Sequence, residues 1–265
     1  MIIDCHTHLN QYGSIENISS LEERVSKLLL SMTSHNVGYA LVLSSYQVND
    51  QRPSTEQLIE ATKKYDNLGI VAGYSIDNHT DEDLKRYREW IKDGKVKGLK
   101  LYCGYEHYYP YDKRYQVVYD TCVEFGIPVM IHTGDTFTEK GKLRFSHPIH
   151  IDEVAVDNPE LKIVVCHLGN PWIEDCQEIV YKNDNVYADV SGLAVGKFDH
   201  FFEKIMAEKV AEMINYAGEP RYLLYGTDWP ISDMDSYLSF VARLKLKPEY
   251  RDKLMYKNSK ELFKI

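Results

Sequence analysis

The chain has 265 residues, which is enough to bury a full hydrophobic core. Hydrophobic residues make up 44% of it and charged residues 27%, a composition that is typical of a globular protein and argues against disorder. The net charge of −9 would repel a phosphate backbone, and no basic stripe is present, so nucleic acid is not an expected partner.

Apolar runs of strand length alternate with helical patterns along the whole chain. In chain order, strands are expected at Ile2–His8, Tyr39–Ser44, Gly69–Tyr74, Val96–Leu101, Pro128–His132, Lys162–His167, Val186–Asp189 and Tyr222–Gly226. Helices are expected between and after them at Leu21–Ser34, Ser54–Tyr65, Asp81–Lys92, Arg114–Phe125, Ile151–Val156, Ile173–Tyr181, Phe202–Tyr216, Ser236–Leu244 and in the tail. Strands that alternate with helices imply a parallel sheet, and eight such units are typical of an α/β fold, the (β/α)8 TIM barrel. We therefore predict a single domain over residues 1–265.

Three of the predicted connections are long. They are Asn10–Ser20, Tyr102–Lys113 and Thr133–His150, and each follows a strand. All three should therefore rise from the face of the barrel where active sites lie, and long loops in compact domains are often functional.

Side chains of the type that bind metals stand at the ends of four predicted strands. His6 and His8 end the first strand, and residues two apart on a strand point to the same face, so both can reach one metal ion. His132, His167 and Asp228 end the fifth, sixth and eighth strands. An open doubly wound sheet gathers its ligands at one switch point, so this spread favours a closed barrel. Taken singly, His132 is explained slightly better as a buried histidine held by a hydrogen bond.

These segments resemble the amidohydrolase superfamily, and most closely its amidohydrolase-2 branch, the relatives of aminocarboxymuconate-semialdehyde decarboxylase. The resemblance spans nearly the whole chain, and its motifs are specific in combination. The matching pieces are Asp4–His8, Val129–Asp135, Asp152–Val164, Lys162–Gly169 and Tyr225–Pro230.

The resemblance implies a site for one divalent metal ion. His6, His8, His132 and Asp228 would hold it, and the ion would most often be zinc, although manganese, iron or cobalt also suits this ligand set. His167 would stand just outside the ligands, where it could move a proton or polarise the substrate. Asp228 would act both as ligand and as proton shuttle, so His167 and Asp228 are the expected catalytic residues.

Three further residues are candidates for substrate binding. Lys100 ends the fourth strand, where two-metal relatives carry a carboxylated lysine that bridges the ions. It could instead bind a substrate carboxylate or form a salt bridge. Tyr102 opens a tyrosine-rich loop that suits a pocket for a small ring or acid, although an exposed, lid-like loop explains it as well. Arg144, in the long fifth loop, is a candidate for binding an anion.

The resemblance leaves two enzymatic functions open. The first is a hydrolase, in which a metal-activated water attacks an amide, ester or lactone of a small, carboxylate-bearing molecule. The alternative is a non-oxidative decarboxylase of an aromatic or unsaturated acid. A nuclease of the TatD type would usually place a glutamate where Lys100 stands. A non-catalytic barrel is disfavoured by the complete ligand set.

The sequence also leads to expectations about the location of the protein in the cell and its assembly. The five cysteines form no C-x-x-C pair, so reduced thiols that pack as small hydrophobic groups are expected. No signal-peptide pattern or membrane-length apolar run is present. We expect a cytoplasmic protein that does not bind membranes, and the resemblance adds a homodimer as an alternative to a monomer.

Overall fold

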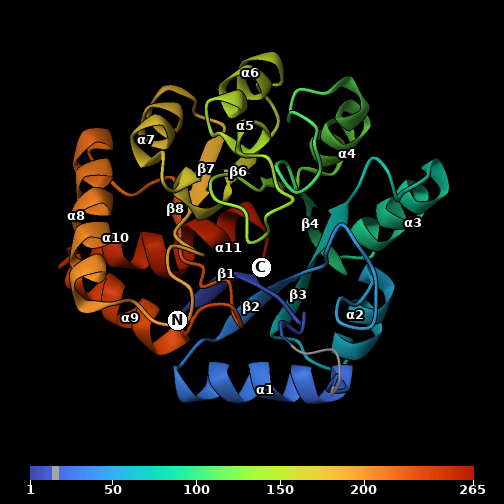
Figure 1. Cartoon of the computed structure of the whole chain (residues 1–265), viewed down its shortest axis with the longest axis horizontal. Helices are drawn as coiled ribbons and strands as arrows, with labels where there is room; N and C mark the ends of the chain where they lie inside the picture. The colour runs from blue at the N-terminus through green and yellow to red at the C-terminus, as the bar shows by residue number, and fades with distance from the viewer. Residues whose placement is uncertain (14–17) are drawn as a thin grey trace.

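Eight parallel strands, each paired with its neighbours in chain order, form one sheet at the centre of the protein (Figure 1). The computed structural model describes residues 1–13 and 18–265, so the middle of the predicted Asn10–Ser20 loop, residues 14–17, lies outside the described residues. The strands are β1 (Ile3–Thr7), β2 (Tyr39–Leu43), β3 (Leu68–Tyr74), β4 (Val96–Leu101), β5 (Val129–Ile131), β6 (Ile163–Val165), β7 (Val186–Asp189) and β8 (Leu223–Leu224).

Backbone hydrogen bonds between β1 and the segment that follows β8 close the sheet. The Cys5 amide donates to the Tyr225 carbonyl at 2.9 Å, and the Asp228 amide donates to the His6 carbonyl at 2.8 Å. Thr7 also pairs in parallel with Trp229. The prediction of a (β/α)8 barrel is therefore confirmed.

Helices surround the barrel at the positions that the sequence predicts, with one addition (Figure 1). They are α1 (Leu21–Ser34), α2 (Thr55–Thr62), α3 (Asp81–Lys92), α4 (Gln116–Phe125), α5 (Leu143–Ser146), α6 (His150–Asp157), α7 (Ile173–Lys182), α8 (His200–Ala217), α9 (Met234–Arg243), α10 (Pro248–Asp252) and α11 (Asn258–Leu262). Ser20, Ser54 and Thr80 form capping boxes at the starts of α1, α2 and α3, which fixes where these helices begin. The added helix α5 is a single turn, too short to show a periodic pattern.

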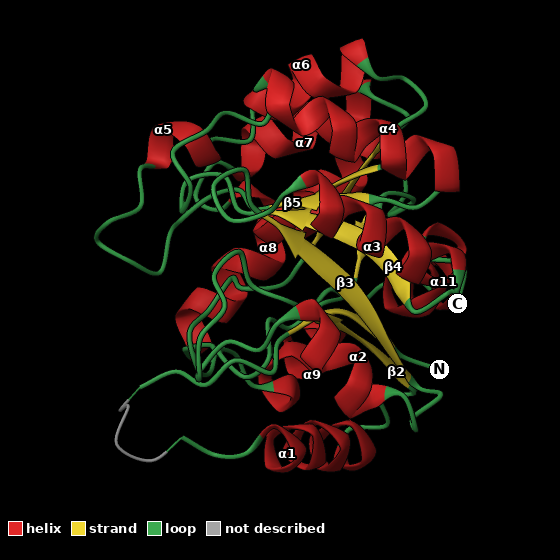
Figure 2. Ribbon diagram, turned by 90° about the vertical axis from the view of Figure 1, so that its right-hand side faces the viewer, coloured by secondary structure: helices red, strands yellow, loops and turns green. Residues whose placement is uncertain are grey.

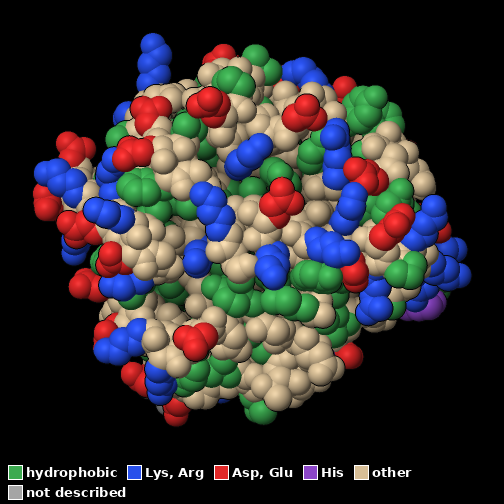
Figure 3. Space-filling model, turned by 180° about the vertical axis from the view of Figure 1, so that it is seen from behind, with side chains coloured by type: hydrophobic (Ala, Val, Ile, Leu, Met, Phe, Trp, Pro, Cys, Tyr) green, Lys and Arg blue, Asp and Glu red, His purple; other side chains and the backbone are tan. Residues whose placement is uncertain are grey.

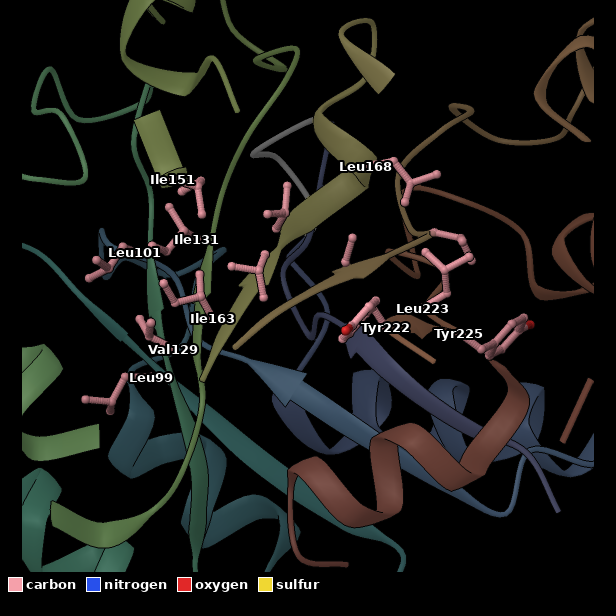
Figure 4. Close-up of a cluster of buried hydrophobic side chains, with 14 of the residues drawn as sticks. Leu99, Leu101, Val129, Ile131, Ile151, Ile163, Leu168, Tyr222, Leu223 and Tyr225 are labelled. Atoms are coloured by element: carbon pink, nitrogen blue, oxygen red, sulfur yellow. The ribbon is translucent and has the colours of Figure 1, made fainter. Parts of the chain in front are cut away.

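The hydrophobic core has two layers because successive strand residues point to opposite sides of the barrel wall. Outward residues such as Leu99, Leu101, Val129 and Ile131 pack under the helices (Figure 4). Inward residues fill the barrel, and Phe263 from the C-terminal tail packs against this inner layer. The inner layer includes Ile3, Cys5, Leu41, Leu43, Val71, Met130, Val164, Cys166 and Leu224. All five cysteines are free and buried, as the sequence predicts.

The two faces of the barrel differ. The long loops project on one side, and both termini lie on the other (Figure 2). On the face with the termini, acidic and basic side chains are interspersed around a band of hydrophobic ones (Figure 3). Among the described residues, no helix combines the length and the apolar character needed to cross a membrane.

Glu106 is a buried acid that ties the loop after β4 to the loop after β3. Its Oε1 accepts a hydrogen bond from Ser75, whereas its Oε2 has no partner. Burial raises the pKa of Glu106 to about 7, and the nearby charge of Asp77 acts in the same direction. The folded protein therefore opposes ionisation of this side chain more than the unfolded chain does.

Glu106→Gln is expected to stabilise the protein at alkaline pH. Glu106 has a higher pKa in the folded protein than in the unfolded chain. The stability of the native protein therefore falls as the pH rises from the pKa of the unfolded chain through about 7, and it stays lower at higher pH. The glutamine cannot ionise. At pH 8 the free energy of unfolding of the variant should therefore exceed that of the native protein by up to about 3 kcal/mol, and at pH 5 the difference should be smaller. Thermal melts at both pH values measure this. The exposed Glu60→Gln serves as control, and equal gains at both pH values would contradict the prediction.

Candidate active site

The His-x-His pair of β1 lies at the carboxyl end of the barrel, with both rings directed inward. His6 and His8 are buried, and their ring centroids lie 5.3 Å apart. The Nδ1 of His8 donates to the Leu43 carbonyl at 3.0 Å, and the Nδ1 of His6 lies 2.9 Å from a carboxylate oxygen of Asp189. Each Nδ1 is therefore engaged as a donor, which leaves the Nε2 lone pairs free.

Asp228, at the end of β8, faces the Nε2 atoms of both histidines. Its Oδ1 lies 3.7 Å from Nε2 of His6 and 3.2 Å from Nε2 of His8. Its backbone has a φ of 68°, a left-handed conformation that is uncommon for a residue other than glycine and is frequent at functional sites. That turn directs the carboxylate toward the histidines instead of along the strand.

Asp4 holds the ends of β1 and β8 together beneath this group. Its carboxylate accepts hydrogen bonds from the His6 amide at 3.1 Å, from the Thr227 amide at 3.1 Å and from the Thr227 hydroxyl at 2.6 Å. The fully buried side chain of Asp4 therefore fixes the backbone at His6 and at Thr227, the residue before Asp228.

The protonation states fit a divalent metal ion. Burial lowers the pKa of His6 to about 4, and the charge of Lys100 acts in the same direction. Although burial alone would raise it, the adjacent His8 and His6 bring the pKa of Asp228 to about 2. Neutral imidazoles and an ionised carboxylate are the forms that bind metals. The ligand atoms of His6, His8 and Asp228 lie within 4.8 Å of one another, so these residues fit such an ion.

His132 lies beside this cluster but does not join it. Burial lowers its pKa, with His167 acting in the same direction, so it is a neutral imidazole. Its Nε2 donates to the Asp135 carbonyl at 3.0 Å. Its ring centroid lies 5.1 Å from that of His167. The assignment of His132 as a ligand therefore stays a prediction.

His167 stands on the opposite side of His6, with ring centroids 4.9 Å apart. Its backbone φ is 62°, which turns the chain sharply at the end of β6. Its Nδ1 lies 3.1 Å from the carbonyl and 2.9 Å from the hydroxyl of Ser191, and its amide donates to Asp189 at 3.0 Å. Because Nδ1 is held there, Nε2 is the nitrogen that can take or give a proton. Burial lowers the pKa of His167, so the ring is held in its neutral form, in which Nε2 carries a lone pair.

Sequence reasoning missed Asp189 and Ser191. Asp189 ends β7, as the other site residues end their strands, so that same signal would have found it. Its buried carboxylate contacts His6 and the His167 amide, and it accepts a hydrogen bond from the Ser191 hydroxyl. Nearby His6 keeps the pKa of Asp189 well below its usual range despite burial. A second group with metal-binding spacing, His6, His167 and Asp189, shares this network.

A cavity opens above these residues and contains two cations. Lys100 is buried in the barrel, and its Nζ donates to the Cys166 sulfur at 2.7 Å. Arg52, from the loop after β2, lines the same cavity and was missed because a single arginine in a loop carries no pattern. Tyr102 lines the wall, but its hydroxyl is already used by the Ser44 carbonyl at 2.5 Å. Other lining residues include Asn10, Tyr12, Ser45, Tyr46, Tyr105, Phe137 and Ile231.

Arg144, the predicted anion-binding residue, does not line this cavity. It lies in the short helix α5, where its guanidinium sits 4.5 Å from the centre of the Phe145 ring. The structure therefore offers Arg52, not Arg144, as the arginine that faces the site.

Gly192→Ala is expected to lower kcat by roughly 100-fold because it displaces His167, the histidine predicted to transfer a proton. A Cβ atom at Gly192 would lie 2.4 Å from Nδ1 of His167, so the ring must leave its contacts with Ser191. Gly196→Ala is a matched control: both glycines have positive φ, at 62° and 71°, but nothing lies within 4 Å of a Cβ at Gly196. Steady-state kinetics and thermal melts separate the two effects, and equal activity losses would refute the collision.

The fold and this cluster define a class: TIM-barrel enzymes that gather histidine and aspartate side chains at the carboxyl ends of the strands around a divalent metal ion. The model of the Amidohydrolase family, amidohydrolase-2 type, matches residues 3–265. The chain belongs to this family, whose enzymes bind a divalent metal. No curated protein matches its sequence.

Solved structures support the same fold. A probable 2-pyrone-4,6-dicarboxylic acid hydrolase from Acinetobacter baumannii with citric acid bound is 16% identical, with a TM-score of 0.70 and coverage of 100% of this chain and 99% of that one. A 5-carboxyvanillate decarboxylase from Sphingomonas paucimobilis is 12% identical, with a TM-score of 0.69 and coverage of 100% and 99%. A dihydroxybenzoic acid decarboxylase from Polaromonas with bound manganese and the inhibitor 2-nitroresorcinol is 14% identical, with a TM-score of 0.68 and coverage of 99% and 96%.

Proposed function

We propose that this protein is a metal-dependent hydrolase of a small ester, amide or lactone that carries a carboxylate. The observation that carries the proposal is the position of His167, a neutral imidazole with its Nε2 free, in the same cavity as ionised Asp228. A residue that can accept a proton thus faces a group that can hold a metal, which is the pairing that hydrolysis of a carbonyl compound needs.

His6, His8 and Asp228 would hold the ion, with His132 as the predicted fourth ligand. When bound, a divalent ion supplies Lewis acidity, which polarises a carbonyl oxygen and makes a nearby water more acidic. We propose zinc as the resident ion because imidazole and carboxylate ligands suit it, although manganese, iron and cobalt accept the same set. Elemental mass spectrometry of gently purified protein tests this, with His132→Ala beside it. Loss of metal in that variant would support His132 as a ligand, and full retention would remove it from the set.

The protein's own groups would handle the proton and the substrate. His167 would accept a proton at Nε2 while Ser191 keeps Nδ1 in place, and the nearby charge of Asp189 would stabilise the positive charge that develops on the ring. Arg52 and Lys100 both line the cavity and would bind the substrate carboxylate.

A non-oxidative decarboxylase is the second candidate. It is favoured by the combination of two cations with aromatic walls, because that lining also suits an aromatic acid, and by decarboxylases among the structures that share the fold. In that reaction the same cations would hold the acid, and a proton would replace the lost carboxylate on the ring.

Isotope labelling separates these two candidates. The metal-loaded protein would be incubated with a panel of small esters, lactones, amides and aromatic acids in oxygen-18 water and, separately, in deuterium oxide. A hydrolase places solvent oxygen in the product acid. A decarboxylase releases carbon dioxide and places deuterium at the vacated carbon. If no member of the panel gives either result, both candidates are wrong.

A further inference from the structure

Two cavities meet at the candidate active site. Both are lined by His132, His167 and Asp228, and Phe137 and Ile231 also border both. From this junction one cavity runs toward the loops after β2 and β4, and the other runs toward the loop after β7. We name the first the arginine branch, defined by Arg52, Lys100, Tyr46 and Tyr102, and the second the β7-loop branch, defined by Asn170, Gly192, Leu193, Ala194 and Val195.

The two branches differ in charge and size. The arginine branch contains both cations of the site. Among the described residues that line the β7-loop branch there is no lysine or arginine, and Asp135 lies at its edge. An acidic group is therefore favoured in the first branch and disfavoured in the second. The β7-loop branch is also the larger, at about 140 Å³ against about 60 Å³, which is more room than one water needs.

We propose that the substrate lies across both branches, with its acid-bearing half in the arginine branch and an uncharged half in the β7-loop branch. This rests on the proposed hydrolase function. The bond that breaks, between the acyl carbon and an oxygen or nitrogen atom, then lies beside His167 at the junction. The water oxygen forms a new bond to the acyl carbon, one water proton reaches the departing atom through His167, and no other reactant is needed. Ala194 and Val195 set the largest uncharged half that is accepted.

The wall of the β7-loop branch is fixed in place, so it can select by size. The Leu193 amide is held in place because it donates a hydrogen bond to the Tyr237 hydroxyl at 2.6 Å. The Ala194 carbonyl accepts a hydrogen bond from the Ser232 hydroxyl. Gly196 exchanges backbone hydrogen bonds with the loop after β8: its amide donates to the Ile231 carbonyl at 2.8 Å, and its carbonyl accepts from the Asp233 amide at 2.8 Å. A larger side chain on this wall should therefore narrow the branch and leave the loop where it is.

The test uses monoesters of one small diacid with a methyl or a benzyl alcohol half, on the metal-loaded full chain. Val195→Trp and Ala194→Leu should lower kcat/KM for the benzyl ester by roughly tenfold or more and leave the methyl ester within about threefold. Arg52→Gln should lower both esters by a similar factor, since it acts on the shared acid half. Lys197→Trp lies on the same loop, is exposed and lines neither branch, so it serves as the matched control.

A binding measurement makes the inference independent of turnover. In the matching ketones a methylene replaces the ester oxygen, so they cannot be hydrolysed, and calorimetry gives their Kd. Val195→Trp should weaken the phenyl-bearing ketone relative to the smaller one by roughly tenfold. An unchanged ratio, or no binding of either ketone to the native chain, would overturn the inference. If the ketones bind in the expected pattern but no ester, amide or lactone is cleaved, the hydrolase proposal fails while the branch assignment stands.

Discussion

Asp228→Asn is expected to remove most of the bound divalent ion and to lower kcat/KM by about a thousandfold or more, without unfolding the barrel. The asparagine keeps the size of the side chain but loses the negative charge that faces both Nε2 atoms of His6 and His8. A divalent ion would then meet two neutral ligands and an amide, which is a much weaker set. Metal content by elemental mass spectrometry, kcat/KM and a thermal melt measure the three parts of the prediction.

Asp233→Asn is the matched control for this variant. Asp233 caps helix α9 through a hydrogen bond to the Ser236 amide at 3.0 Å, and asparagine caps helices equally well. Metal content and activity should therefore stay near the native values. If Asp228→Asn retains a full complement of metal, Asp228 is not a ligand and the metal centre must be assigned anew.

His167→Asn is expected to lower kcat by about 10² to 10⁴-fold while the metal content stays near that of the native protein. The expected loss reflects the proposed role of His167 in proton transfer, and the metal is expected to stay because His167 is not among the proposed ligands, which include the group His6, His8 and Asp228. Asparagine is chosen because it tolerates the left-handed backbone that His167 adopts, at a φ of 62°. A change in kcat without a change in metal content is the signature to look for.

This variant also decides between the two groups with metal-binding spacing. If the ion lies between His6, His167 and Asp189 instead, His167→Asn should lose the metal together with the activity. His200→Asn is the control, because His200 is exposed at the start of α8 and does not line the site. Native activity in His167→Asn would exclude any role for His167 in catalysis.

Part of the candidate site can be predicted from the sequence. His6, His8, His132, His167 and Asp228 are predicted because each ends a predicted strand, and in a parallel barrel all strands end on one face. The same rule applied to β7 gives Asp189, the last residue of that strand, which the sequence analysis did not single out. Arg52 could not be predicted, because the sequence does not indicate the direction in which the side chain of a single loop arginine points.

The sequence by itself determined the barrel, the order of its units and the face that carries the chemistry. These follow from local causes: alternation along strands, helix caps and residues at strand ends. Only the tertiary structure decided that Arg52 faces the cavity and Arg144 does not, that Ser191 and Leu43 fix which imidazole nitrogens are free, and that the cavity has two branches. Those features depend on contacts between loops far apart in the chain, and their geometry exists only once the barrel has closed.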